Sequence, residues 1–326
     1  MGSLIGHVAP GLGFFLIGLW HLFKHIKLHL LHPYTYKSLS WFPSPRLRYL
    51  ELYLIILGSC ASVAMELFIS PRRHQPLDTD GSIPSNHLHN FEHSFISMTF
   101  IVYGVFAILL DKMKTKSQLG LTHLLGALAF AQELFLFHLH STDHMGVEGQ
   151  YHTLLQIVIF VSLLTTLMGI GQPDSFLISF VRSVSIVFQG AWLMIMGVML
   201  WTPSLIPKGC FMNLEEGHNV VRCRDDHSLH RAKSIVNIEF SWFLISLAIS
   251  VMSMYLCMVR IYGEKSACWT TLKSKEVDEG LQYDLEILSS SSGTGSDEDL
   301  ESQKGADSHV DERKSFIHGK IKTGEK

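Results

Sequence analysis

Residues 132–152, QELFLFHLHSTDHMGVEGQYH, place Glu133 and four histidines at the edge of an apolar run. Neutral imidazole and carboxylate groups suit zinc, and imidazole also suits copper or iron. A charged group inside the hydrocarbon of a bilayer costs at least ~2.5–3.5 kcal/mol. Because Phe-Leu-Phe follows Glu133, this carboxyl needs a partner or a proton. It is therefore the first candidate for function.

Seven apolar stretches are long enough to position these residues, since a helix needs about 20 residues to cross a bilayer. They are residues 4–23, 49–69, 91–110, 119–137, 153–170, 176–201 and 235–261. The predicted fold class is all-α, a polytopic integral membrane protein with seven transmembrane helices in residues 1–263. The lipid bilayer is its expected surrounding, and nothing in the sequence determines the oligomeric state.

Residues 264–326 are predicted to form an acidic, serine-rich, disordered cytoplasmic tail. They hold 14 acidic and 9 basic residues, and they lack the apolar content needed for a packed core. Serines beside the run DEDLE suit an acidic-directed kinase, so a kinase or an adaptor is an expected partner, and a merely solvating tail is the alternative. The formal net charge of −3 for the whole chain gives no case for nucleic-acid binding.

Lysine and arginine residues beside the spans indicate the orientation, because they concentrate on the cytoplasmic side. Twelve lysines and arginines lie beside the spans on one side of the membrane, and seven lie on the other side. The N-terminus is therefore expected outside or in a lumen, and the tail in the cytoplasm. Whether the membrane is an endomembrane or the plasma membrane stays open. The loop 202–234 is the exception, with five basic residues on the outer side. If that loop is luminal, Cys210 and Cys223 can form a disulfide.

Five of the predicted helices deliver histidine or glutamate to one membrane face. This convergence holds for either orientation, because all these helix ends would move together. The expected ligand set for zinc or another transition metal is His89, His93, Glu133, His138, His140 and His152, with His7 and Glu66 as further outer members. A proton-binding site is the alternative for the same residues. The structural alternative is that these histidines are hydrated and unpaired, and that they anchor the helix ends in the headgroup region.

The spacings within this set differ in what they allow. His89 and His93 are four residues apart, one turn along one helix face, as two imidazoles that share an ion would be. Glu133 and His140 are seven residues apart, two turns along the axis, and are not expected to be adjacent ligands. Elsewhere, His21, His25 and His29 are expected on a basic surface-lying face with Lys24 and Lys27, and His123 at the interface. Arg182 could pair with Glu51, and Gln189 and Gly190 are interpreted as helix packing.

Three stretches carry a resemblance to a known family. They are GHVAPGLGFFLIGLW at the start, ELFLFHLH with His152 beyond it, and RSVSIVFQGAWLMIMGVMLW. Together they resemble the transmembrane protein 45 family, whose plant members are often labelled viral-response proteins. The resemblance spans about residues 1–262 and implies a multi-helix membrane protein, with Glu133, His138, His140 and His152 at family positions. Glu92 departs from it, since animal relatives are expected to have two adjacent histidines there. The resemblance implies no activity.

Three functions therefore compete. The first is a metal- or proton-binding membrane protein, either a transporter or an enzyme with metal-dependent membrane chemistry, and the sequence leaves open whether it is an enzyme. The second is a non-catalytic scaffold or trafficking protein that acts through its cytoplasmic tail. The third is a haem-binding membrane protein, which would need histidines that face one another from two helices.

Overall fold

The computed structural model describes residues 4–69, 75–141, 146–215 and 218–290, without the side chains of Asn86, His140, Ser141, His218 and residues 264–290. Its helices are α1 (Leu4–Leu31), α2 (Leu50–Ala64) with the π-helical turn η1 (Met65–Ile69), η3 (Ser85–His87), α3 (Leu88–Met113), α4 (Gln118–Ser141), α5 (Val147–Gly171), α6 (Phe176–Trp201), η4 (Pro203–Leu205) and α7 (Asp226–Ser290). Seven of the described helices are long and apolar enough to span a membrane. The predicted all-α fold with seven spans is confirmed.

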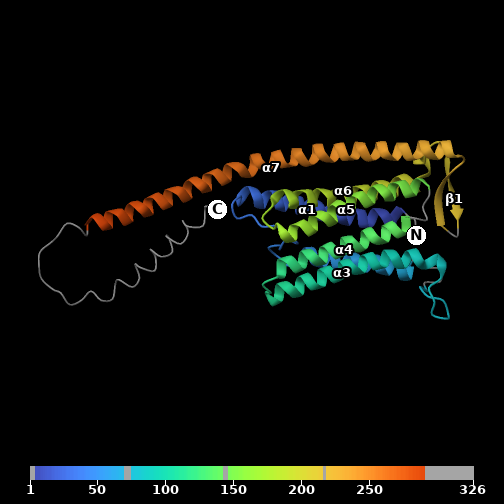
Figure 1. Ribbon diagram of the computed structural model, residues 1–326, viewed down its shortest axis with the longest axis horizontal. Helices are drawn as coiled ribbons and strands as arrows, with labels where there is room; N and C mark the ends of the chain where they lie inside the picture. The colour runs from blue at the N-terminus through green and yellow to red at the C-terminus, as the bar shows by residue number, and fades with distance from the viewer. Residues whose placement is uncertain (1–3, 70–74, 142–145, 216–217, 291–326) are drawn as a thin grey trace, which may run out of the picture. The chain divides into compact units, whose positions relative to one another are not determined.

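The first six long helices form a bundle in which α2, α3, α4, α5, α6 and α1 are neighbours in that order (Figure 1). Helix α6 is its centre, with 67% of its apolar window buried. Alternate helices run in opposite directions, so the bundle has two ends. We call the end that holds the start of α1 the N-terminal end, and the end where residues 32–49 connect α1 to α2 the distal end.

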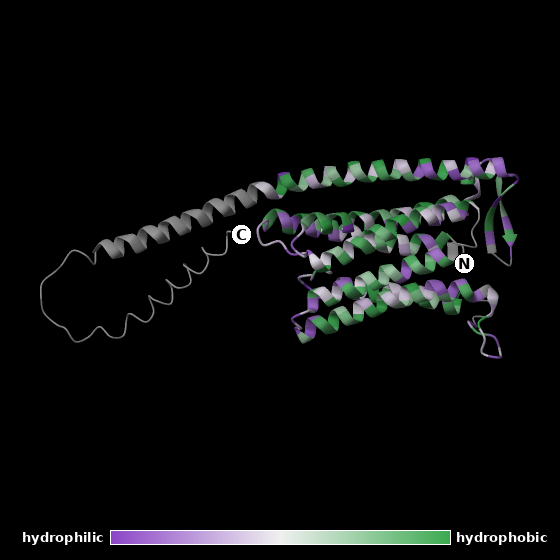
Figure 2. Cartoon of the chain, in the orientation of Figure 1, coloured by the Kyte–Doolittle hydropathy of each residue, from purple (hydrophilic) through white to green (hydrophobic). Residues whose placement is uncertain are grey.

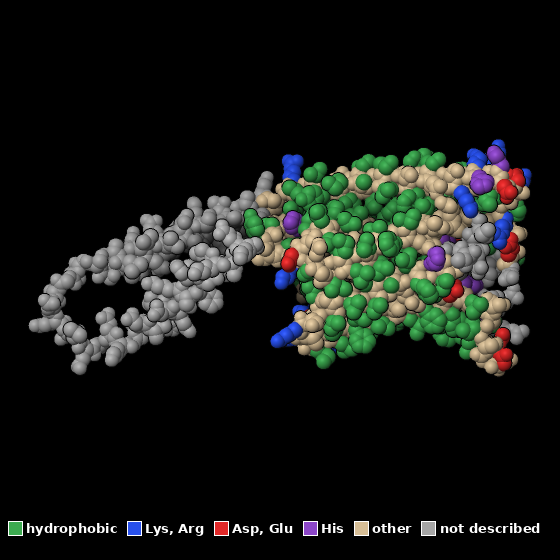
Figure 3. Space-filling view, viewed as in Figure 1, with side chains coloured by type: hydrophobic (Ala, Val, Ile, Leu, Met, Phe, Trp, Pro, Cys, Tyr) green, Lys and Arg blue, Asp and Glu red, His purple; other side chains and the backbone are tan. Residues whose placement is uncertain are grey.

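The helices carry their apolar side chains outward, as a bilayer requires. Large hydrophobic side chains such as Leu57, Leu177 and Trp242 are exposed. Hydroxyl, amide and charged side chains such as Ser179 and Gln189 are fully buried. Apolar residues cover the middle of the helices and polar ones lie at both ends (Figure 2). Charged side chains likewise lie at the ends of the surface seen in Figure 3.

Glycines bring α1 and α6 into close contact. A Cβ atom built on Gly18 would lie 2.6 Å from the Val187 backbone nitrogen, and one on Gly11 would lie 2.8 Å from the Gly190 carbonyl oxygen. Such approach is typical of small residues at helix interfaces in membranes. The predicted packing role of Gly190 is confirmed, because a Cβ there would lie 2.5 Å from the Gly11 carbonyl oxygen.

The connection between α1 and α2 is folded into the distal end of the bundle. Tyr36, Ser38, Trp41 and Phe42 are all buried. At such a place, the backbone N–H and C=O groups of an irregular segment must find hydrogen-bond partners within the protein. The Ser38 backbone N–H donates to the Pro173 carbonyl at 2.6 Å, and the Tyr103 hydroxyl donates to the Ser40 carbonyl at 2.8 Å. We call residues 36–42 the plug.

The predicted surface-lying face on α1 is wrong because the plug covers it. His21 and His25 are buried, and so is His123, which was expected at the interface. The predicted pairing of Arg182 with Glu51 is also not found. Instead, His21 Nε2 lies 2.6 Å from Glu51 Oε1, and Arg182 donates to the plug.

A two-stranded antiparallel hairpin follows α6 at the N-terminal end (Figure 1). Its strands are β1 (Cys210–Glu215) and β2 (His218–Cys223). The sequence left open whether Cys210 and Cys223 are bonded; in the structure they lie opposite one another and form a disulfide. Hydrogen bonds from Arg222 lower the pKa of Glu215 to about 2, so this carboxylate stays ionised and paired in mildly acidic solution.

Helix α7 begins after the hairpin and packs along the bundle through its apolar side chains. Val251 and Met258 join Leu22 and Ile26 of α1 in one buried cluster. The chain divides into two compact units, residues 1–267 and 268–326. Helix α7 continues to Ser290, within the segment for which a disordered tail is expected. The rest of that tail, residues 291–326, lies outside the described residues.

Candidate functional site

Aromatic and imidazole rings connect five helices at the N-terminal end. The His93 ring in α3 lies 6.3 Å from Phe137 in α4, and Phe137 lies 5.6 Å from His152 in α5. His152 is 6.0 Å from His7 in α1, which stacks on Trp201 of α6 at 4.5 Å. His7 and His152 are buried. Three of the predicted histidines, His7, His93 and His152, therefore lie in one packed layer with Phe137 and Trp201.

Glu66 extends this layer to the end of α2. It lies in the π-helical turn η1, a type of irregularity frequent at functional sites. Its Oε1 is 3.5 Å from His93 Nδ1, and its Oε2 accepts a hydrogen bond of 2.7 Å from Asn90 Nδ2. A carboxylate beside an imidazole can share a proton with it. His89 lies next to this pair, its ring 6.4 Å from that of His93.

Glu133 lies deeper than the histidine layer and is almost completely buried, with 1% of its surface exposed. Gln189 of α6 donates from Nε2 to Glu133 Oε1 at 2.8 Å. The other oxygen of each side chain, Glu133 Oε2 and Gln189 Oε1, is buried and has no hydrogen-bond partner among the described residues. Both orphan atoms are acceptors in the ionised form of the pair. One proton is therefore the component that this pair lacks.

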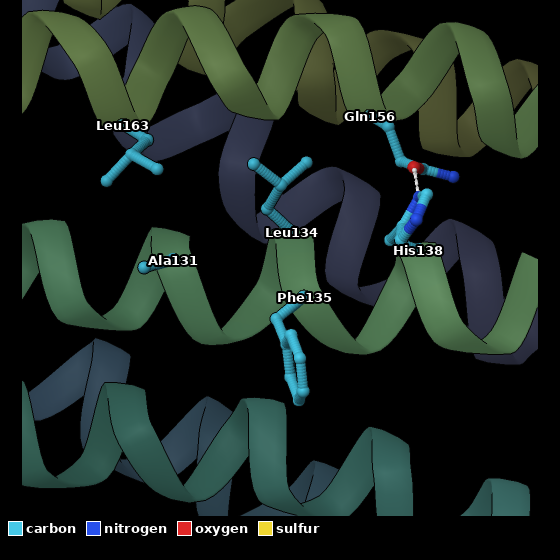
Figure 4. Close-up of a pocket in the computed structure, with 6 residues that line it drawn as sticks. All are labelled: Ala131, Leu134, Phe135, His138, Gln156 and Leu163. Atoms are coloured by element: carbon cyan, nitrogen blue, oxygen red, sulfur yellow. Dashed lines mark hydrogen bonds between the residues drawn. The ribbon is translucent and has the colours of Figure 1, made fainter.

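His138 points away from Glu133. The two residues are five positions apart on α4, which turns their side chains about 140° from each other. His138 donates from Nδ1 to Gln156 Oε1 of α5 at 3.2 Å. Both residues line an open, mostly apolar groove of about 370 Å³ between α4 and α5 (Figure 4). His138 is thus placed beside the lipid-facing groove and Glu133 inside the bundle.

The described ligand candidates meet in pairs rather than in a cage. Among the residues that the structure describes, no three His, Cys, Asp or Glu side chains are arranged to hold one metal ion. The side chain of the expected ligand His140 and the whole of His144 lie outside the described residues. His152 donates from Nδ1 to the Glu148 carbonyl at 3.0 Å, so its neutral form has Nε2 as an acceptor toward the bundle.

The partners of these groups could not be predicted from the sequence. Gln189 was interpreted as packing, and Asn90, Gln156 and Trp201 were not singled out. A polar amide inside an apolar helix was the available signal for Gln189. Nothing in the spacing pairs it with Glu133, because the two residues lie 56 positions apart and meet only through helix packing.

Known proteins match the part of the chain that holds Glu133, His138 and His152. Residues 119–256, from α4 into α7, match a family described as of unknown function, DUF716. The transmembrane epididymal protein 1A of Mus musculus is 24% identical over 212 residues, which is 62% of this chain and 68% of that protein. These matches agree with the predicted resemblance: residues 119–256 are similar to the DUF716 family, and the chain is a distant relative of the transmembrane epididymal protein 1A.

Proposed function

We propose that this multi-pass membrane protein binds a proton at Glu133, inside the helix bundle. The observation that carries this proposal is the pair of orphan acceptors, Glu133 Oε2 and Gln189 Oε1. A proton on Glu133 Oε2 supplies the donor that both atoms lack. A carboxylic acid and a primary amide can form a pair with two hydrogen bonds, and the Gln189 N–H already supplies one of them.

The alternative ligand, a transition metal, has weaker support. A zinc site needs three or four ligands around one point, and among the residues that the structure describes no three carboxyl, thiol or imidazole side chains are arranged in that way. Glu66 pairs with His93, and His138 pairs with Gln156. Of these, the Glu66–His93 pair suits the binding of a proton, since a carboxylate and an imidazole can hold one between them.

Carbodiimide labelling tests the proposal. A membrane-soluble carbodiimide adds the O–H of a protonated carboxyl across one of its N=C bonds, and ionised carboxylates do not react in this way. We expect peptide mass spectrometry of the purified, folded protein to find the label on Glu133 at neutral pH. Glu51 is the internal control, because Trp20, His21 and the Phe42 backbone N–H already hydrogen-bond to its two oxygens, so it should stay unlabelled.

Two variants separate proton binding from packing. Glu133→Gln replaces the acid by an amide that can still pair with Gln189, so the thermal midpoint should match that of the wild type while the label is lost. Glu133→Leu leaves Gln189 without a partner and should cost about 2 kcal/mol. Failure of Glu133 to label at any pH at which the protein is folded would contradict the proposal. Stoichiometric zinc, copper or iron that disappears in His138→Ala/His140→Ala would favour the metal site.

We also propose that the N-terminal end faces a lumen or the exterior. The Cys210–Cys223 disulfide supports this, because such bonds persist in oxidising compartments. In sealed microsomes, an impermeant protease should remove an epitope tag placed after Lys326 and spare one placed between Pro76 and Pro84. The reverse pattern would show that the orientation is inverted.

A further inference from the structure

The groove between α4 and α5 is an apolar hollow with a polar pair at one end. The pair is His138 and Gln156, whose Nδ1 and Oε1 atoms lie 3.2 Å apart. The other residues that line the groove are apolar, namely Ala131, Leu134, Phe135 and Leu163 (Figure 4). His138 is exposed on this surface. The groove therefore presents hydrogen-bonding groups to a molecule that lies among the lipids.

This polar pair lies within the hydrocarbon depth of the bilayer. Residues 240–259 of α7 hold no charged side chain, and 20 such residues have the length of one span. Glu239, just before them, thus marks the edge of the hydrocarbon at the N-terminal end. The Tyr151 hydroxyl of α5 donates to Glu239 at 2.6 Å. Gln156 follows Tyr151 by five residues on α5, so it lies about 7.5 Å deeper in the membrane.

The depth of the pair selects the chemistry of its ligand. A phosphate group would be charged inside the hydrocarbon, where a charge is costly, and the residues that line the groove include no lysine or arginine to pair with it. A hydroxyl group is neutral, and it can donate to an imidazole nitrogen and accept from a side-chain amide. The pair therefore fits a lipid whose polar part is a hydroxyl.

The apolar part of the groove indicates the shape of that lipid. Ala131 precedes His138 by seven residues and Leu163 follows Gln156 by seven, so the lining extends about 10 Å toward the middle of the bilayer on both helices. The space between them is about 370 Å³. A rigid body of fused rings loses less conformational freedom in such a groove than a flexible acyl chain does.

We propose that this groove binds one sterol molecule. The sterol hydroxyl bonds to His138 and Gln156, and the fused rings lie along the apolar lining that ends at Ala131. The site belongs to the leaflet at the N-terminal end, because the polar pair lies near that edge of the hydrocarbon. It is independent of the proton on Glu133, since that carboxyl is buried inside the bundle.

Photolabelling with a sterol probe tests the site. The full chain is reconstituted into phosphatidylcholine vesicles that contain a cholesterol analogue with a diazirine on its ring system and an alkyne for detection. After irradiation, peptide mass spectrometry should find the label on α4 and α5 beside the groove. An excess of cholesterol should remove this label. Epicholesterol, whose hydroxyl has the opposite configuration, should compete less well.

Four variants separate the groove from the rest of the surface. Ala131→Phe fills the apolar part, so the label should fall about tenfold. Leu128→Phe is the control, because Leu128 of the same helix is 54% exposed and lies outside the lining. His138→Phe keeps a ring but removes a hydrogen bond, so the label should fall about fivefold. Glu133→Gln should label as the wild type does.

Equal labelling of Ala131→Phe and Leu128→Phe would overturn the proposal, and so would a label that cholesterol does not displace. A diazirine-bearing phosphatidylcholine that labels the groove and resists cholesterol would make a phospholipid the occupant instead. A sterol label that falls as the protein-to-lipid ratio rises would make the occupant a second copy of the chain. Sterol labelling without carbodiimide labelling of Glu133 would remove the proton site and leave the sterol site intact.

Discussion

Replacing Gly190 with alanine is expected to lower the free energy of unfolding by about 3 kcal/mol, the upper range for overpacking a tight interface. The added Cβ would meet the backbone of α1 at Phe15 N and Gly11 O. Backbone atoms cannot turn aside as a flexible side chain would, so α1 and α6 must separate. The thermal midpoint in detergent, followed by size-exclusion chromatography, measures the effect.

Gly13→Ala is the matched control for this variant. Gly13 lies on α1, the helix that Gly190 of α6 contacts, but a Cβ there would have nothing within 4 Å. Alanine is the better helix former, so the midpoint should stay unchanged or rise. If Gly190→Ala were as stable as Gly13→Ala, the close contact between α1 and α6 would be wrong.

The second large effect is expected at Glu51, which holds the plug to α1 and α2. Its oxygens accept hydrogen bonds from Phe42 N at 2.9 Å and Trp20 Nε1 at 3.1 Å, and Oε1 lies 2.6 Å from His21 Nε2. In Glu51→Leu these donors stay buried without an acceptor. Because each orphan costs about 1–3 kcal/mol, the variant should be less stable by about 4 kcal/mol.

Glu51→Gln separates hydrogen bonding from loss of shape. It keeps one acceptor oxygen and the volume of the side chain, so its loss of stability should fall between the wild type and Glu51→Leu. Limited proteolysis between Pro33 and Arg48 should follow the same order, since release of the plug exposes this segment. Equal protection of all three proteins would show that Glu51 does not hold the plug.

The seven spans could be predicted from the sequence because a bilayer imposes a length and a composition on any helix that crosses it. Each apolar run meets this requirement by its own length and composition, so it can be recognised without knowing which helices pack against it. The convergence of histidine and glutamate at the N-terminal end follows from the same count, since alternate helices must run in opposite directions. The disulfide could be foreseen only as an option, because it depends on the hairpin that places Cys210 opposite Cys223.

The polar contacts of the plug at the distal end could not be predicted in this way. The sequence predicts a basic stripe on the membrane surface, because His21, His25 and His29 follow at spacings of four beside two lysines. Local sequence does not reveal that the plug folds back over that stripe and buries the first two of these histidines. The predicted pairing of Arg182 with Glu51 is wrong for the same reason. Both residues are buried at the distal end, but groups of α1 or of the plug already occupy their hydrogen-bonding positions.

The sequence alone thus determined the membrane class, the number of spans and the end at which titratable groups collect, because each depends on hydrophobicity summed along one segment. Only the tertiary structure decided which polar groups pair. In that structure Glu133 pairs with Gln189, His93 pairs with Glu66, and Arg182 pairs with the plug. A buried polar atom must find its partner wherever packing brings one within about 3 Å, and that position is set by contacts between residues far apart in the chain.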